Sequence, residues 1–218
     1  MLANKEVIIP FESLNYRVND TYNEELRLTN HKVLNLVASK TEFMLGGSAD
    51  LASSTKAYID NTHINSPTHP LGRNINFGIR EHAMAAILNG ISMLGLKTYC
   101  STMLTWSDYL KPAMRMTSLM NLPVTYIFTH DSVSIGQDGP THEPIEQLTT
   151  LRSIPNMITF RPCDFNEVLG CWEYICKNKK PVSLVLSKSK MPKLPNSNPK
   201  LVAAGGYIIG KEEQRLDG

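Results

Sequence analysis

Carboxylate, imidazole, hydroxyl and ammonium side chains follow several apolar runs of this sequence, where loops or helices are expected to begin. Such side chains can transfer protons or hold an anion when a fold brings them together. Each also has a structural explanation, because the helix dipole stabilises a glutamate in a first turn and Asp and Gly are common turn residues. Their function therefore depends on the elements that position them. The residues in question are Asp50, Ser54, Glu81, His130, Asp138, His142 and Lys188.

Several familiar site motifs are absent from the sequence. There is no GxGxxG after the first expected strand and no GxxxxGK[ST], so neither the usual dinucleotide fingerprint nor a P-loop is present. Neither a GxSxG nucleophile elbow nor an HExxH metal motif occurs, and the histidines and cysteines lack zinc-ligand spacing. The motifs therefore predict no metal site in this chain.

The apolar runs predict about six short strands that alternate with five helices. The strands are expected at 43–45, 74–77, 97–101, 124–129, 157–160 and 182–186, and the helices at 30–40, 80–94, 105–120, 145–152 and 165–177. Strands that are unbroken apolar runs indicate a mostly parallel, doubly wound sheet with helices on both faces, an α/β fold. In such a sheet the ligand lies beyond the carboxyl ends of the strands, where the polar residues above fall.

Local signals add detail to these elements. The helix from about Arg80 is expected to end at a capping Gly95, and Asp164 with Glu167 predicts a capped start for the last helix. The first strand is expected to stop at the turn of residues 46–50, and residues 51–71 to form a long surface loop. The side chains expected in the core are Ala83, Ile87, Ile91 and Leu94 of one helix and Met114, Met116 and Met120 of the next.

The composition is that of an ordinary globular protein. Of the 218 residues, 42% are hydrophobic and 19% are charged, which is too apolar for a disordered chain. A net charge of +2 without Lys/Arg runs argues against nucleic-acid binding. The longest apolar run, Ala83–Leu88, is too short to cross a membrane, and the first residues do not resemble a signal peptide. A cytoplasmic protein with reduced thiols is expected, since no CxxC spacing links Cys100, Cys163, Cys171 and Cys176.

Four segments together carry a specific family pattern. They are GGSADL (Gly46–Leu51), FGIREHAM (Phe77–Met84), THDS (Thr129–Ser132) and DGPTH (Asp138–His142). SDYLKPA (Ser107–Ala113) and Arg161–Pro162 agree with it. In order and spacing, from about Arg27 to Pro195, the sequence resembles transketolase. The resemblance implies the central pyrimidine-binding domain of that enzyme, with the thiamine-diphosphate-binding fold.

The resemblance implies a site for the aminopyrimidine of thiamine diphosphate. Glu81 matches the glutamate that hydrogen-bonds a ring nitrogen and favours the imino tautomer, whose exocyclic nitrogen removes the thiazolium C2 proton. That role needs a carboxyl group that keeps or shares a proton, which desolvation favours. Asp50 matches a residue that closes the pocket. The positions that match ring-stacking residues are Met103, Trp106 and Tyr109, of which Met103 and Trp106 depart from the usual phenylalanines.

The resemblance also implies sugar-phosphate substrates. The implied reaction moves a two-carbon ketol unit from xylulose 5-phosphate to ribose 5-phosphate or erythrose 4-phosphate, in the pentose phosphate pathway. Arg27, Ser54 and His130 match phosphate or substrate contacts, and Asp138 and His142 match positions that bind sugar hydroxyls. Glu81, His130 and His142 are the implied catalytic residues. Lys188 stands where the family has an arginine, so a bidentate fork is lost and weaker phosphate affinity is expected; Gln137 stands in place of a glutamate.

The resemblance implies a division of the chain into three parts. Residues 1–24 are expected to be a linker or docking arm, 25–195 the pyrimidine-binding domain, and 196–218 a linker with the truncated start of a C-terminal domain. The family's diphosphate and its Mg²⁺ or Ca²⁺ belong to a separate N-terminal domain, supplied by the second subunit of a homodimer. The chain alone is therefore expected to bind cofactor poorly and to be inactive, as a fragment or as half of a split enzyme.

Two alternatives stay open. One is a related thiamine enzyme, dihydroxyacetone synthase or deoxyxylulose-phosphate synthase, which the DGPTH and GGSAD segments disfavour. The other is a non-catalytic interaction module that kept the fold. The joint presence of Glu81, His130 and His142 argues against that module, because drift would not be expected to spare all three.

Overall fold

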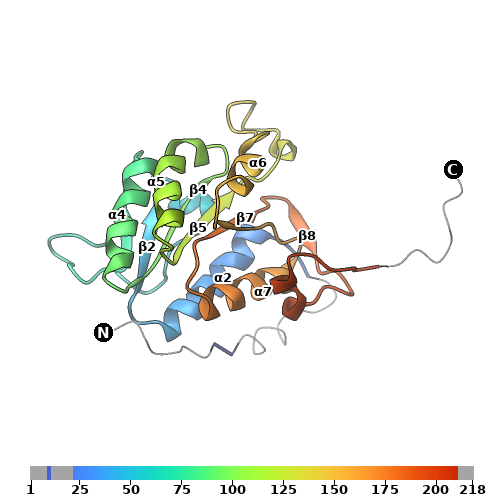
Figure 1. Ribbon diagram of the computed structural model, residues 1–218, viewed down its shortest axis with the longest axis horizontal. Helices are drawn as coiled ribbons and strands as arrows, with labels where there is room; N and C mark the ends of the chain where they lie inside the picture. The colour runs from blue at the N-terminus through green and yellow to red at the C-terminus, as the bar shows by residue number, and fades with distance from the viewer. Residues whose placement is uncertain (1–8, 11–21, 211–218) are drawn as a thin grey trace, which may run out of the picture.

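Six parallel strands form the central sheet, in the order β3-β2-β4-β5-β7-β6. The computed structural model describes residues 9–10 and 22–210, and within them helices cover both faces of this sheet (Figure 1). The strands are β2 (Met44–Ser48), β3 (Asn74–Asn76), β4 (Lys97–Met103), β5 (Val124–Thr129), β6 (Ile158–Phe160) and β7 (Val182–Leu186). The doubly wound α/β fold expected from the sequence is therefore confirmed.

Two pairs of helices form the outer layers. The longer helices are α2 (Leu26–Lys40), α4 (Glu81–Met93), α5 (Ser107–Leu119) and α7 (Phe165–Lys177), and the shorter ones are α3 (Ala52–Thr55), α6 (Gln147–Arg152), η1 (Val133–Ile135) and η2 (Pro199–Ala204). Helices α2 and α7 lie on one face of the sheet, and α4 and α5 lie on the other (Figure 1). None of the described helices is long and apolar enough to cross a membrane.

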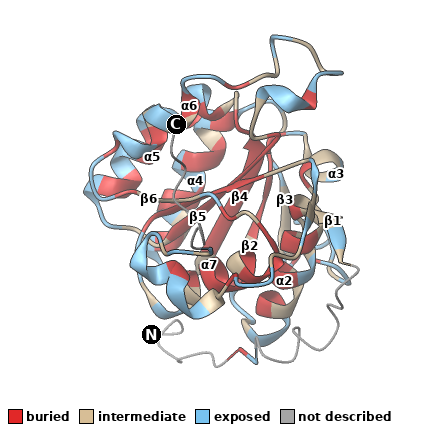
Figure 2. Cartoon of the chain, turned by 90° about the vertical axis from the view of Figure 1, so that its right-hand side faces the viewer, coloured by how far each residue is buried: buried red, intermediate tan, exposed pale blue. Residues whose placement is uncertain are grey.

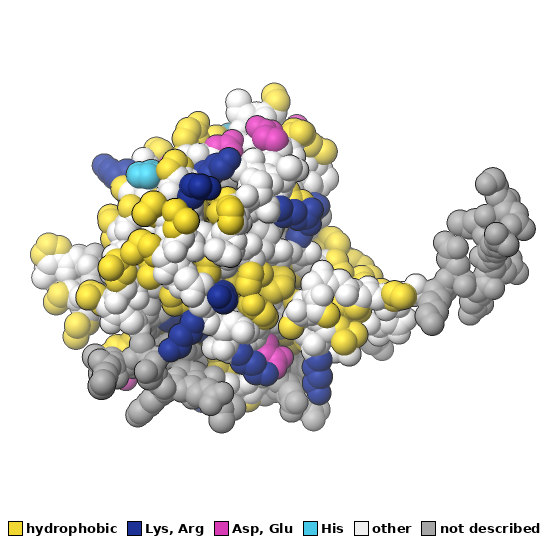
Figure 3. Space-filling view, viewed as in Figure 1, with side chains coloured by type: hydrophobic (Ala, Val, Ile, Leu, Met, Phe, Trp, Pro, Cys, Tyr) yellow, Lys and Arg dark blue, Asp and Glu magenta, His cyan; other side chains and the backbone are white. Residues whose placement is uncertain are grey.

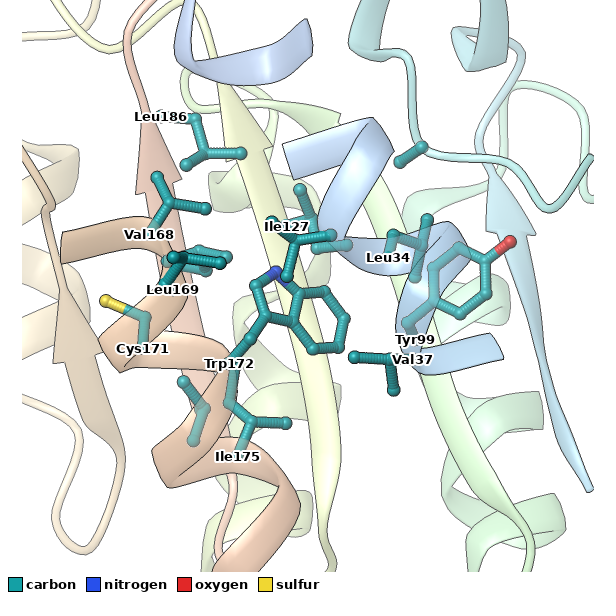
Figure 4. Close-up of a cluster of buried hydrophobic side chains, with 14 of the residues drawn as sticks. Leu34, Val37, Tyr99, Ile127, Val168, Leu169, Cys171, Trp172, Ile175 and Leu186 are labelled. Carbon is teal, nitrogen blue, oxygen red and sulfur yellow. The ribbon is translucent and has the colours of Figure 1, made fainter. Parts of the chain in front are cut away.

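Each face of the sheet has its own hydrophobic core. Trp172 of α7 lies against α2 and the sheet in one core, and its indole Nε1–H donates to Asn30 Oδ1 at 2.8 Å (Figure 4). The second core lies under α4 and α5 and includes Met84, Leu88 and Met114. Strands β2, β4, β5 and β7 are buried along almost their whole length (Figure 2), as expected for a parallel sheet covered on both sides, whereas the edge strands β3 and β6 are only partly buried.

Residues 46–48 continue the first central strand, so the expected turn at Gly46 is wrong. A Cβ on Gly46 would lie 1.9 Å from the carbonyl oxygen of Tyr99, and one on Gly47 would lie 1.8 Å from that of Ile75. The glycines are needed because neighbouring strands approach β2 closely on both sides. The turn comes after Ser48 and includes Asp50, whose φ is 62°.

The inward face of α4 also differs from the expected one. Its buried residues are Glu81, Met84, Ala85, Leu88, Asn89 and Ser92, whereas Ile87 is 49% and Leu94 is 79% exposed. Asn89 is accommodated in the core because its amide donates to the carbonyl of Ala113 at 3.1 Å and its oxygen accepts from Thr117 Oγ1 at 2.6 Å. The helix has apolar residues on both faces, so the apolar stripe alone could not orient it. On α5, Met114 is in the core as expected, but Met116 and Met120 are exposed.

The expected helix ends are confirmed. Gly95 has a φ of 87° and its N–H donates to the carbonyl of Ser92 at the end of α4. Asp164 Oδ1 accepts from the N–H of Glu167, and Glu167 Oε2 accepts from the N–H of Cys163, which caps α7. The segment 51–71 is a loop apart from α3 and two isolated bridges.

The chain flanks the sheet at both of its described ends. β1 (Asn23–Glu25) pairs with β8 (Lys190–Pro192) in an antiparallel ribbon that the sequence pattern did not predict. The turn of η2 packs on α7, where a Cβ on Gly170 would lie 2.3 Å from the carbonyl oxygen of Pro199. Most of the expected linker at 1–24, and residues 211–218 of the expected C-terminal start, lie outside the described residues.

Candidate functional site

The carboxyl ends of the strands deliver the candidate residues to one edge of the sheet. Met103 pairs with Thr129 and Thr129 pairs with Leu186, so β4, β5 and β7 end level with one another. His130 follows β5 directly, and Lys188 comes two residues after β7. A row of chemically active side chains at this edge is what a parallel sheet provides for ligand binding.

Glu81 begins α4 at this edge. The turn that leads to it uses Gly78 at a φ of 67°, and Arg80 Nη1 donates to the carbonyl of Phe77 at 3.1 Å. The Glu81 residue is only 9% exposed, and its carboxylate has no hydrogen-bond or ion-pair partner among the described residues. Its oxygens are not among the fully enclosed atoms, so they reach solvent at this edge of the sheet. A ligand that displaces this solvent would have to give the carboxylate a polar partner.

His130 is buried, with a hydrogen bond at one ring nitrogen and a carboxylate near the other. Its Nδ1 lies 2.8 Å from Thr129 Oγ1, and its Nε2 lies 4.0 Å from Asp138 Oδ2. The pKa of His130 is lowered to about 4, first by burial and then by the positive charges of Lys188 and Arg27, with Asp138 acting against them. His130 is therefore neutral at pH 7 and can exchange hydrogen bonds without carrying charge.

Two cations near His130 are each held by a carboxylate. Lys188 Nζ lies 3.1 Å from Asp138 Oδ2, and this contact holds the pKa of Asp138 below its usual range. Arg27 Nε lies 2.5 Å from Glu25 Oε2, and its Nη1 donates to the carbonyl oxygen of Ser54 at 2.6 Å. Guanidinium and ammonium groups gathered in this way can bind a phosphate.

An aromatic cluster adjoins the charged residues. Trp106 stacks on Tyr109 with ring centroids 5.9 Å apart, and its edge meets the His142 ring at 5.1 Å. Thr105 Oγ1 donates to the carbonyl of His142 at 2.9 Å, which ties the loop after β5 to the start of α5. A flat heteroaromatic ring could pack against such a cluster.

The structure joins most of the predicted site residues in three groups. One is Arg27 with Ser54, the second is His130 with Asp138 and Lys188, and the third is Trp106 with Tyr109 and His142. Met103 is buried at the same edge, and its carbonyl oxygen accepts from the N–H of Trp106 at 3.1 Å. Asp50 is exposed there and shares no hydrogen bond, ion pair or ring contact with these groups.

Sequence reasoning missed the residues that hold the predicted ones in place. Glu25, Thr129 and Thr105 position Arg27, His130 and His142 respectively. Thr129 is the last residue of β5 and Thr105 lies in the turn two residues before α5, and a hydroxyl at either place is unremarkable in sequence. Glu25 precedes Arg27 by two residues, a spacing that does not itself indicate a contact, so their opposite charges were the one signal for this ion pair.

Comparison with known proteins gives one consistent match. The family described as "Transketolase, pyrimidine binding domain" matches residues 25–193. The transketolase of Bacillus subtilis is 43% identical over 192 residues, which cover 86% of this chain and 29% of that protein. The crystal structure of Campylobacter jejuni transketolase superposes with a TM-score of 0.84 at 38% identity, covering 97% of this chain and 32% of that one. That from Leishmania mexicana gives 0.87 at 31% identity, covering 94% and 31%. The chain thus spans about a third of the length of these relatives.

Proposed function

Because this chain belongs to the transketolase family through its pyrimidine-binding domain, we propose that it supplies one half of a transketolase active site. The reaction is transfer of a two-carbon ketol unit from xylulose 5-phosphate to ribose 5-phosphate or erythrose 4-phosphate, in the pentose phosphate pathway. The observation that carries the proposal is Glu81, a residue only 9% exposed whose carboxylate has no polar partner among the described residues, at the same sheet edge as His130, Asp138 and Lys188.

The described residues fit the pyrimidine end of thiamine diphosphate. Glu81 would share a hydrogen bond with a ring nitrogen, which satisfies the carboxylate that the fold leaves without a partner. Trp106, Tyr109 and Met103 would be the residues that contact the ring, and Asp50 would help to close the pocket. When bound, thiamine diphosphate supplies a carbon nucleophile; the task of Glu81 is to hold or return a proton on the pyrimidine.

The charged residues fit a sugar phosphate. Arg27 and Lys188 would bind the phosphate, and Ser54 would line that end of the pocket. Asp138 and His142 would bind sugar hydroxyls near the reacting carbons. His130 stays neutral because burial and the two cations disfavour its protonation, so it can donate to or accept from a hydroxyl or carbonyl oxygen of the substrate.

The diphosphate and its metal need residues from elsewhere. Among the described residues, no group of three His, Cys, Asp or Glu side chains could hold a metal ion. We assign Mg²⁺ or Ca²⁺ and the diphosphate to a separate domain from a second subunit of a homodimer. The chain alone is then expected to bind thiamine diphosphate weakly and to be inactive.

The outer face of α4 and α5 is the proposed contact with that second subunit. It exposes large apolar side chains that monomeric surfaces rarely gather (Figure 3): Ile87 and Met93 of α4 with Leu94 directly after it, and Tyr109, Met116 and Leu119 of α5 with Met120 directly after it. Since α4 begins at Glu81, a domain that covers this face lies next to the proposed pyrimidine site. The cytoplasm remains the proposed compartment, consistent with free thiols at the four cysteines.

A chimaera tests the function. Residues 25–193 replace the matching domain of Bacillus subtilis transketolase, and two-carbon transfer from xylulose 5-phosphate to ribose 5-phosphate is measured with thiamine diphosphate and Mg²⁺. The chimaera should be active, and Glu81→Gln should lower kcat by about 10²–10⁴-fold, the range for losing a proton-transfer group. The control Glu173→Gln changes a carboxylate on α7 that pairs with Lys177, and it should leave kcat unchanged. A folded, dimeric chimaera without activity would refute the proposal.

A further inference from the structure

The strained backbone of His130 needs a neighbour that holds it. Its φ is 60°, in the left-handed region that residues other than glycine adopt only uncommonly, with asparagine, aspartate and histidine the most frequent of them. Its side chain is 1% exposed, so the strained residue also fixes where a buried imidazole points. Thr129 holds the ring at Nδ1, but no hydrogen bond of Thr129 explains the backbone turn itself.

Asp131, the next residue, is fixed by a contact across the sheet. Arg161 donates to Asp131 Oδ2 from Nε at 3.2 Å and from Nη2 at 2.9 Å. Arg161 follows β6 at the sheet edge, and β7 lies between β6 and β5. The ion pair therefore spans the carboxyl end of β7. Lys188 lies two residues after that end.

This ion pair is not an ordinary surface pair. The Asp131 side chain is only 9% exposed, and its Oδ1 is buried without any partner among the described residues. Arg161 is therefore the one polar partner of that carboxylate within the described part of the chain. Without Arg161, a buried charge would be left unpaired, and the cheapest response is for Asp131 to swing toward solvent. Such a swing turns the peptide that it shares with His130.

We propose that Arg161 is a positioning residue, which acts through Asp131 to hold the backbone of His130 and to keep its Nε2 beside Asp138 in the substrate pocket. The inference deepens the proposed function and rests on it, since it assumes that His130 handles substrate. It also gives a task to the Arg161–Pro162 segment, which no other part of the site explains.

The test measures His130 directly in the full 218-residue chain. Histidine labelled with ¹³C and ¹⁵N allows the pKa of His130 to be followed by NMR, without any catalytic turnover. The groups that face His130 are Lys188, Arg27, Asp138 and His142, and neither Arg161 nor Asp131 is among the causes of its low pKa. In the wild-type chain its pKa should be about 4.

Two substitutions of opposite charge separate positioning from direct electrostatics. Arg161→Met removes a cation and Asp131→Ala removes an anion, so a purely through-space effect would shift the His130 pKa in opposite directions. Positioning predicts that both raise it toward the ordinary value of about 6.5, because each removes the anchor and the ring leaves its buried place. The double variant should raise it no further. Asp131→Ala leaves no unpaired buried carboxylate and should fold even if Arg161→Met does not.

Arg152→Met is the matched control. Arg152 lines the same cavity of about 240 Å³ as Arg161 but makes no ion pair with Asp131, so its loss should leave the His130 pKa near 4. An unchanged pKa in folded Arg161→Met and Asp131→Ala, or opposite shifts in the two, would overturn the positioning role. If the chimaera is inactive but both variants raise the His130 pKa, the proposed function is refuted and the positioning role still holds.

Discussion

The neutral state of His130 makes the stability of the chain depend on pH in a defined window. Its pKa is lowered to about 4 in the folded chain, mainly by burial, against about 6.5 when unfolded. Between these values the unfolded chain binds a proton that the folded chain does not. Stability therefore rises with pH across this window, and acidification from pH 7 toward pH 4 destabilises the fold.

The size of the effect follows from the two pKa values. Between pH 8 and pH 5, linkage between pKa values of about 6.5 and about 4 gives a loss of about 2 kcal/mol. Solvent at the pocket mouth screens part of this, so about 1–2 kcal/mol is expected. His130→Asn should remove the loss, and asparagine tolerates the φ of 60° at this position.

Denaturant unfolding at pH 8, 7, 6 and 5 gives the free energy of unfolding of each chain. The quantity to compare is the change in this free energy between pH 8 and pH 5, in the wild-type chain and in His130→Asn. The constant cost of truncating the ring cancels when each variant is compared with itself at pH 8. The control His82→Asn, at an exposed position of α4, measures how much an ordinary exposed histidine contributes to the pH dependence of stability. Parallel stability curves for the wild-type and His130→Asn chains would refute the argument that His130 is held neutral by burial.

Three further substitutions test other parts of the structure. Lys188→Arg in the chimaera should lower the KM for xylulose 5-phosphate by roughly fivefold with little change in kcat, because a guanidinium restores a bidentate contact worth about 1 kcal/mol; an unchanged KM would contradict the phosphate role. Gly46→Ala should lower the free energy of unfolding by about 1–3 kcal/mol or more in a denaturant titration, because the new methyl meets the Tyr99 carbonyl. Leu94→Asp should weaken self-association of the chain in sedimentation experiments, whereas Leu71→Asp, at a loop position that is 91% exposed, should not; equal association in both would contradict the docking face.

The sequence was most informative where one physical signal decided the structure. The strands at 124–129 and 182–186 have the predicted bounds because every residue in them is buried, so their apolar runs begin and end with the strand. The Asp164 cap and the Gly95 end rest on local hydrogen bonds and backbone angles, which need no knowledge of the rest of the fold.

The sequence pattern gave the wrong structure, or none, where the same residues were compatible with two arrangements or where the pairing was long-range. α4 has apolar side chains on both faces, and only the packing of Asn89 against α5 and β5 selects the buried one. The strand at Gly46 and Gly47 resembles a turn in sequence, because a close approach of strands and a tight turn both require glycine. The β1–β8 ribbon joins segments far apart in the sequence, and no local pattern encodes that pairing.

The ion pairs of the charged pocket residues could not be predicted from the sequence alone. Arg27 and Lys188 were expected as phosphate ligands, yet in this structure each is already paired, with Glu25 and Asp138. Under the proposed function, a phosphate that enters the pocket would compete with these carboxylates, and Lys188 would give up its contact with Asp138 to bind it. Asp138 would then be free to accept a hydrogen bond from a sugar hydroxyl. We therefore propose that phosphate binding and hydroxyl recognition are coupled through this ion pair, so a sugar phosphate should bind more tightly than either inorganic phosphate or the free sugar would indicate.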